Sequence, residues 1–136
     1  MMSFGMSDRH HIKVEDGFIH IVINGIIQAA DISKLTEIGN RIAQEKHHYW
    51  ILMDATGMTG FAMDARRRAA LNPSGQNFQG AAVFGASLLA KTLITLVTRA
   101  LLLLGQTHIR VQFVDSVEEG RQWIAEQRTR AAALRK

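Results

Sequence analysis

Apolar residues follow two patterns along this chain: short continuous runs, and segments in which they recur every three or four positions. The short runs predict strands, and Glu15-Asp16-Gly17 between the first two runs predicts a hairpin, because an Asp-Gly step favours a tight turn. Helical spacing predicts a helix after the hairpin and after each later strand. The expected strands are 12–14, 18–23, 49–53, 81–85 and 109–114, and the expected helices run from Asp31 to about His47, from Met63 to Leu71, from the cap Ser87 to Gly105, and from Ser116 onward.

This order of elements predicts an α/β fold with a mixed, mostly parallel sheet. Strands that alternate with helices pair in parallel and are covered by the crossover helices, whereas the leading hairpin adds an antiparallel edge. We therefore expect about five strands and about four helices. The second strand is apolar on both faces, which is typical of a strand between two neighbours. Its faces carry Ile19, Ile21 and Ile23 on one side and Phe18, His20 and Val22 on the other.

Composition narrows the class of protein. The 136 residues, 47% of them hydrophobic, fit one domain, which we place at residues 8–136 after a flexible tail at residues 1–7. The absence of cysteine excludes disulfides and thiolate metal sites. The first residues lack the basic region and apolar core of a signal peptide, so we expect a cytoplasmic protein. The net charge of +4 is spread over predicted helices without a nucleic-acid-binding motif, which indicates solvated helix faces and no nucleic acid partner.

The most apolar helix, Leu88 to Gly105, is predicted to pack on the sheet and not to insert into a membrane. Lys91 and Arg99 would each cost about 2.5 to 3.5 kcal/mol in the hydrocarbon. The polar residues of this helix fall within an arc of about 120°. The residues expected to face inward are Leu93, Leu96, Val97, Ala100, Leu101 and Leu104. Leu88 and Leu102 fall on the polar arc, so they either contact a partner or pack under the C-terminal tail.

No arrangement of residues indicates a catalytic or metal site. The chain lacks an HExxH motif, a G-x-S-x-G elbow, a P-loop and a dinucleotide fingerprint. No carboxylate stands at ligand spacing from the histidines, and the neighbours in His10-His11 and His47-His48 point in different directions. We therefore expect no enzyme activity, no metal and no cofactor. We interpret His20, inside a predicted strand, as a hydrogen-bonded structural residue.

The stretch 51–68 is the best candidate for a binding surface. Asp54 closes a buried strand, and open α/β sheets bind ligands beyond such strand ends. A loop is predicted from Asp54 to Asp64, followed by a helix whose N-terminal dipole favours anions. The candidate partner- or anion-binding residues are Asp54, Thr56, Thr59, Asp64, Arg66 and Arg67. The alternative is structural, with Asp54 accepting loop amides, Asp64 capping the helix, and the loop glycines permitting the turn.

This stretch and the segments after it resemble the STAS domain of anti-sigma factor antagonists, and more closely the SpoIIAA-like branch of uncharacterised bacterial proteins. The resemblance rests on Ile51-Leu52-Met53-Asp54-Ala55-Thr56-Gly57, on Asp64 at the next helix, on the apolar strand 81–85, and on the ending from Val111-Gln112-Phe113 through Glu118-Glu119 to Trp123-Ile124. It spans roughly residues 12–128 and implies a SpoIIAA-like fold. Such antagonists carry a phosphorylated serine after the helix-start aspartate, where this chain has Ala65. The resemblance therefore implies a module without the serine phospho-switch.

Two functions follow from the resemblance. In the first, the domain is a non-enzymatic regulatory module that binds another protein, or a second copy of itself, through the loop and the helices beside it. In the second, it is similar to CRAL-TRIO carriers and holds a small apolar ligand or lipid against the long helix. The small size of the domain disfavours the carrier, because little volume remains once the core is filled.

Overall fold

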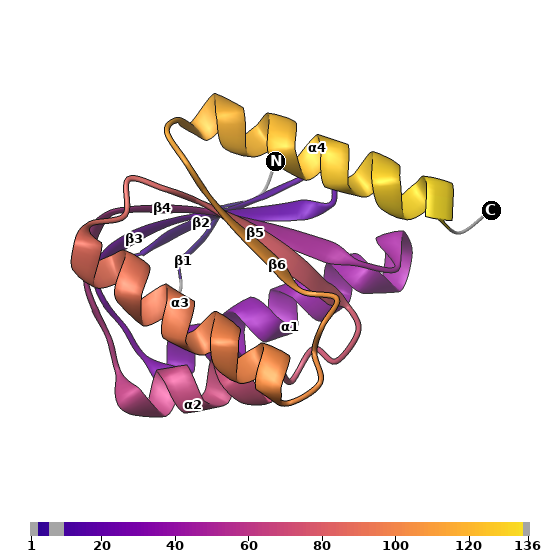
Figure 1. Cartoon of the computed structure of the whole chain (residues 1–136). Helices are drawn as coiled ribbons and strands as arrows, with labels where there is room; N and C mark the ends of the chain where they lie inside the picture. Colours follow the sequence, from indigo (N-terminus) through magenta and orange to yellow (C-terminus); the bar gives the residue numbers. More distant parts are fainter. Residues whose placement is uncertain (1–2, 6–9, 135–136) are drawn as a thin grey trace.

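The computed structural model describes residues 3–5 and 10–134, in which one sheet separates two layers of helices. Helix α4 covers one face of the sheet, and α1, α2 and α3 cover the other (Figure 1). The elements are β1 (Ser3–Gly5), β2 (His11–Glu15), β3 (Phe18–Ile27), α1 (Ala29–Lys46), β4 (Tyr49–Phe61), α2 (Met63–Leu71), β5 (Phe78–Phe84), α3 (Leu88–Leu103), β6 (Arg110–Val114) and α4 (Val117–Leu134).

The strands lie in the sheet in the same order as in the chain, from β1 at one edge to β6 at the other. β2 pairs antiparallel with β1 and β3, whereas β3, β4, β5 and β6 pair in parallel. Right-handed crossovers between parallel strands that advance in one direction place their helices on one face, which explains the shared layer of α1, α2 and α3. The mixed, mostly parallel sheet, the leading hairpin and the four helices confirm the predicted α/β fold.

Strand β1 is an addition that the sequence pattern did not predict. We expected a flexible tail over residues 1–7, whereas Ser3–Gly5 pairs antiparallel with β2, Phe4 lying opposite Ile12. Three residues are too few to show an alternating pattern. The strand is explained instead by the outer edge of β2, whose backbone groups need hydrogen-bond partners. The rest of the expected tail lies outside the described residues.

Two cores lie on the two faces of the sheet, as the alternation in β3 predicts. Ile19, Ile21 and Ile23 are fully buried in the larger core beneath α1, α2 and α3, and Phe18 belongs to the smaller core beneath α4. In the smaller core Trp50 of β4 packs edge-to-face on Trp123 of α4, with ring centroids 5.8 Å apart. β3 lies between β2 and β4, which confirms its predicted position between two neighbours.

Helix α3 is less covered than its sequence predicts. Its buried stripe consists of Ala90, Ile94 and Leu101. Leu96 and Leu104 are 49% and 58% exposed, so the prediction that they face inward is wrong. The reason is tertiary: α3 contacts β4 and, on one flank, α2, so part of its wide apolar face has no neighbour among the described residues. None of the helices in residues 10–134 combines the length and the apolar character needed to cross a bilayer.

Candidate functional site

The predicted loop after Asp54 is in fact strand. β4 continues to Phe61 and pairs in parallel with β3, with register shifts after Val22 and after Gly25. Our prediction of a loop from Asp54 to Asp64 is therefore wrong, because only Ala62 lies between the end of β4 and the start of α2. Gly57 explains the long strand, because a Cβ there would lie 2.6 Å from Asn24 Oδ1 and 2.9 Å from the carbonyl oxygen of Ile23. The glycine thus permits close pairing with β3 and not a turn.

The candidate residues of this stretch do not form a single site. The half-buried Asp54 lies opposite Phe84 at the end of β5, and its Oδ1 accepts the Thr56 N–H at 3.0 Å. Thr59 is exposed further along β4. Asp64 is exposed in the first turn of α2, and the residue before the helix is Ala62, so Asp64 does not cap the helix from the predicted position. The local bond of Asp54 agrees with the structural alternative.

Arg66 and Arg67 instead line a shallow groove between α2 and α3. The groove has a volume of about 230 Å³, and its other walls are Met63, Ala70, Leu96, Val97 and Ala100. Neither arginine has an ion-pair partner among the described residues. The Nε of Arg66 is buried without a hydrogen-bond partner in this part of the chain, whereas Arg68 donates a hydrogen bond to Ser33 of α1. The groove therefore combines apolar walls with unpaired positive charge.

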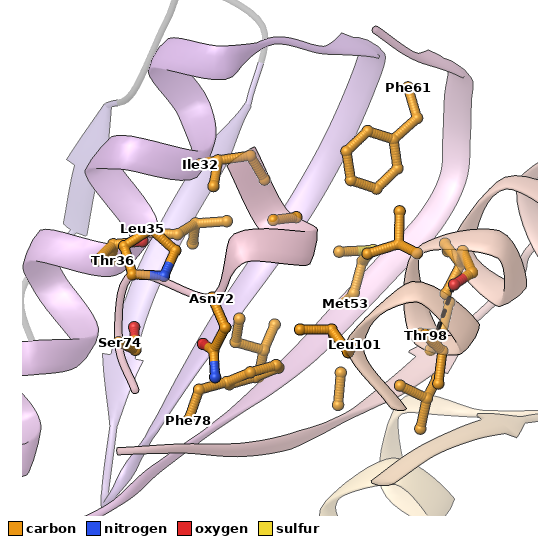
Figure 2. Close-up of a pocket in the computed structure, with 18 of the residues that line it drawn as sticks. Ile32, Leu35, Thr36, Met53, Phe61, Asn72, Ser74, Phe78, Thr98 and Leu101 are labelled. Atoms are coloured by element: carbon orange, nitrogen blue, oxygen red, sulfur yellow. Dashed lines mark hydrogen bonds between the residues drawn. The ribbon is translucent and has the colours of Figure 1, made fainter. Parts of the chain in front are cut away.

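A cavity that we did not predict lies between the sheet and the layer of α1, α2 and α3 (Figure 2). Its volume is about 120 Å³, and residues from all three helices and from β4, β5 and β6 line it. Val97 of α3 lines both this cavity and the groove. Our expectation that core packing leaves little volume did not foresee the cavity, because the sequence does not report how well side chains interdigitate.

Most of the few polar groups that line the cavity have partners within the described part of the protein. Thr98 donates to the Ile94 carbonyl oxygen at 2.9 Å, and Asn72 donates to the Gly75 carbonyl oxygen at 2.7 Å. Tyr49 and Ser74 share a hydrogen bond through their hydroxyls. Burial raises the pKa of Tyr49 to about 12, although the bond to Ser74 acts in the opposite direction. The cavity therefore presents an apolar surface to any occupant.

Several leucines of α3 and of the residue after its C-terminal end are exposed to solvent. We call them the leucine face: Leu88, Leu89, Leu96, Leu102, Leu103 and Leu104, with exposures from 43% to 88%. Leu88 and Leu102, which the sequence suggested as interface residues, both belong to it. α4 lies on the opposite face of the sheet (Figure 1), so the described part of the C-terminal helix does not cover these leucines.

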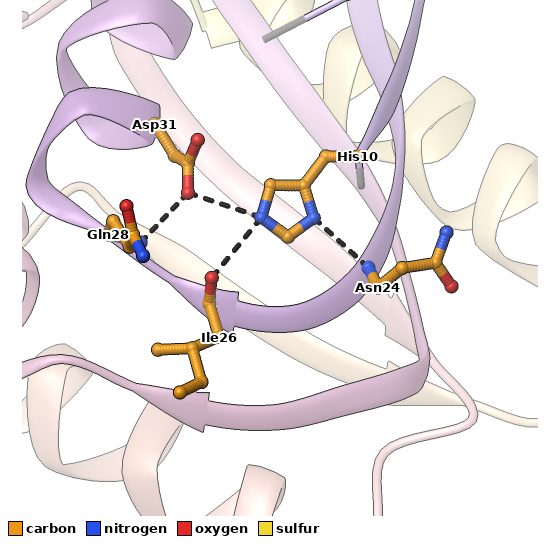
Figure 3. A network of polar contacts seen from close by, with 5 residues as sticks. All are labelled: His10, Asn24, Ile26, Gln28 and Asp31. Atoms are coloured by element: carbon orange, nitrogen blue, oxygen red, sulfur yellow. Dashed lines mark hydrogen bonds and ion pairs between the residues drawn. The ribbon is translucent and has the colours of Figure 1, made fainter. Parts of the chain in front are cut away.

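A buried histidine and aspartate form a network that the sequence did not reveal (Figure 3). His10 Nδ1 accepts the Asn24 N–H at 3.0 Å, and its Nε2 lies 3.1 Å from Asp31 Oδ2 and 3.3 Å from the Ile26 carbonyl oxygen. Since Nδ1 accepts a hydrogen bond, Nε2 carries the proton, and neither nitrogen is left to act as a base. The network is therefore structural and ties the end of β3 to the start of α1.

The same network corrects the predicted start of the first helix. We placed the cap at Asp31, whereas α1 begins at Ala29 after the cap residue Gln28. Asp31 lies in the first turn, where its Oδ2 accepts the Gln28 N–H at 2.8 Å. A carboxylate at this position satisfies a free amide at the helix N-terminus, which explains why the pattern resembled a cap.

A polar cluster joins the hairpin to α4. His20 Nδ1 lies 3.1 Å from Glu15 Oε2, which confirms His20 as a hydrogen-bonded structural residue, and Arg121 Nη2 donates to the same carboxylate at 3.1 Å. Burial raises the pKa of Glu15, but the hydrogen bonds and charges of Arg121 and His20 outweigh burial and lower it overall. No group of three or more metal-ligating side chains is found in the described part of the chain.

Comparison with known proteins supports the fold. No protein-family model and no curated protein matches the sequence. Among solved structures, the chain is similar to an uncharacterised protein of the DUF3478 family from Shewanella loihica, described as having a SpoIIAA-like fold. The TM-score is 0.53 at 18% identity, over 88% of this chain and 98% of that one. The chain thus has a SpoIIAA-like fold, and the resemblance seen in the sequence is confirmed at that level.

Proposed function

We propose that this protein is a non-enzymatic interaction module of the STAS and SpoIIAA-like type, which binds another protein through the leucine face and the adjacent α2. The leucine face is the observation that carries the proposal. Six exposed leucines at one helix and its C-terminal end leave a large apolar area in water, and exposed apolar patches mark interaction sites. The positive charges of Arg66 and Arg67 beside it favour a partner with both apolar and acidic groups. The proposal includes a cytoplasmic location and no role in nucleic acid binding.

The start of α2 supports a module without the serine phospho-switch. Ala65 occupies the position after Asp64 at which antagonists of this fold carry their serine, and it is fully buried. A phosphate adds nearly two negative charges and three oxygens, for which a fully buried side chain has no room. Regulation of the module therefore rests on binding and not on phosphorylation at this position.

Site-specific photo-crosslinking in cells tests the proposed surface. A photoreactive amino acid replaces Leu96 or Leu103 on the leucine face, and in matched controls it replaces Gln122 or Glu126, which are exposed on α4. We expect a discrete adduct from the α3 positions and none from the α4 positions. The mass of the adduct separates another protein from a second copy of this chain. Equal labelling from both helices, or no adduct from α3, would contradict the proposed surface.

The cavity favours a second candidate function, the binding of a small apolar ligand. Its lining is apolar, and its volume of about 120 Å³ falls below the roughly 300 to 1,000 Å³ of ordinary ligand pockets. A long-chain lipid therefore does not fit, whereas a compact apolar group does. Binding of xenon, an apolar atom smaller than benzene, followed by amide chemical-shift changes, tests this function. Ala69→Leu, which adds three carbons to the cavity wall, is expected to abolish these changes while the protein stays folded.

A further inference from the structure

We infer that the cavity and the groove between α2 and α3 form one site for a short-chain carboxylate. The carboxylate lies at Arg66 and Arg67, and the hydrocarbon enters the cavity past Val97. This inference rests on the second candidate function, because it requires that the cavity accepts an apolar group. Beyond that function, the inference specifies the charge of the ligand, the length of its hydrocarbon chain and the direction in which the ligand lies.

The first argument is the shared wall. Val97 lines both the cavity and the groove, so the two spaces meet at this side chain. Val97 is itself half-buried and stands on the flank of α3 that faces α2. A ligand that occupies both spaces therefore requires the Val97 side chain to move. A ligand that occupies both must be apolar at one end and polar at the other.

The second argument is the unpaired guanidinium. The buried Nε of Arg66 has no acceptor among residues 10–134, and a buried donor without a partner is costly. Asp64, the carboxylate nearest in sequence, lines a different depression together with Arg67, Arg68 and Ser33. A guanidinium binds a carboxylate through two parallel N–H···O bonds. A carboxylate in the groove would therefore satisfy Arg66 and add an interaction with Arg67.

The third argument is size. A cavity of about 150 Å³ holds a benzene molecule, so the cavity of about 120 Å³ holds roughly five carbons. Hexanoate has a five-carbon tail, and longer chains would leave methylenes outside. The site thus fits a short carboxylate and excludes the long acyl chains of membrane lipids.

The test compares hexanoate with 1-hexanol, which has a similar chain without the charge, by NMR titration at pH 7 and constant salt. Charge-assisted hydrogen bonds contribute enough to make hexanoate about tenfold tighter than hexanol. For Arg66→Gln we expect the affinity for hexanoate to fall by about tenfold while the affinity for hexanol is unchanged. Arg130→Gln removes the same charge from the exposed surface of α4 and is expected to behave as the parent protein. Arg66→Lys keeps the positive charge but lacks the two parallel N–H donors of a guanidinium. Its affinity for hexanoate should therefore lie between those of the parent protein and Arg66→Gln.

Chain length provides an independent readout. From butanoate to hexanoate each added methylene should tighten binding by about fourfold, the value for burial of one methylene group. Octanoate should bind no more tightly than hexanoate, because the cavity is then full. A continued gain up to decanoate would overturn the size argument and indicate a larger opening.

The remaining outcomes separate this inference from the function on which it rests. If hexanol binds and hexanoate binds no more tightly, the carboxylate site is wrong and the apolar cavity stands. If neither hexanol, hexanoate nor xenon binds, the inference and the second candidate function both fail. Should Arg66→Gln unfold, Arg67→Gln tests the positive charge of the groove and Arg66→Lys tests the paired N–H donors of Arg66, and unchanged hexanoate affinity in both would overturn the inference.

Discussion

Single residues of similar type have very different roles in this protein, and the neighbouring histidines show this most clearly. His10 is 2% exposed and hydrogen-bonded through both nitrogens, whereas His11 is exposed on β2. Neither the composition nor the spacing of residues in the sequence distinguishes His10 from His11. Only the path of the chain, which brings Asn24 and Asp31 to His10, distinguishes them.

We therefore predict that His10→Ala lowers the free energy of unfolding by about 2 to 4 kcal/mol, because it removes one hydrogen-bond partner from the buried Asp31 carboxylate and one from the Asn24 N–H. His11→Ala, the matched control, should change it by less than about 0.5 kcal/mol. Urea denaturation of both variants measures the difference. Equal effects of the two substitutions would contradict the structural role of the network.

A second prediction at the residue scale concerns alkaline pH. The pKa of Tyr49 is about 12 in the folded protein against 10.0 as its ordinary value, so the unfolded chain loses this proton first as pH rises. The contribution of the neutral Tyr49 hydroxyl to the free energy of unfolding is fully present below pH 10. It is lost as the pH rises from 10 to 12. The loss amounts to about 2 to 3 kcal/mol, since each pKa unit is worth 1.36 kcal/mol.

Lysine and arginine side chains also titrate at high pH, so the measurement compares the protein with Tyr49→Phe. Denaturant midpoints from pH 9 to pH 11.5 should fall more steeply for the parent than for the variant. Parallel curves would show that the Tyr49 hydroxyl ionises as readily in the folded state as in the unfolded chain.

At the scale of elements, the orientation of α3 decides which of its leucines stabilise the fold. Leu101 is 4% exposed and packs in the buried stripe, whereas Leu103 is 88% exposed. We predict that Leu101→Ala lowers the free energy of unfolding by about 2 to 4 kcal/mol, as for other buried leucines. Leu103→Ala should leave it within about 0.5 kcal/mol. Thermal and urea unfolding measure both, and a large loss for Leu103→Ala would mean that α3 is rotated from the orientation described.

At the scale of the whole molecule, the fold is expected to need no metal. His10 has both ring nitrogens engaged, His20 contacts Glu15 through Nδ1, and the chain has no cysteine thiolate. Treatment with EDTA should therefore change the melting temperature by less than about 1 °C. A drop of several degrees that zinc or calcium reverses would reveal a site that these arguments miss.

The sequence alone determined the order and type of the elements from β2 to α4, because each of them depends on local periodicity, whereas the three residues of β1 are too few to show it. The bounds of α2, Met63–Leu71, and the two-sided burial of β3 were predictable from apolar spacing. The extension of β4 was not, since Gly57 and Gly60 read as loop residues until β3 provides a long edge for pairing. The cavity, the His10 network and the uncovered leucine face depend on how separate elements meet. Contacts between distant residues leave no periodic signal in the chain, so only the tertiary structure decided them.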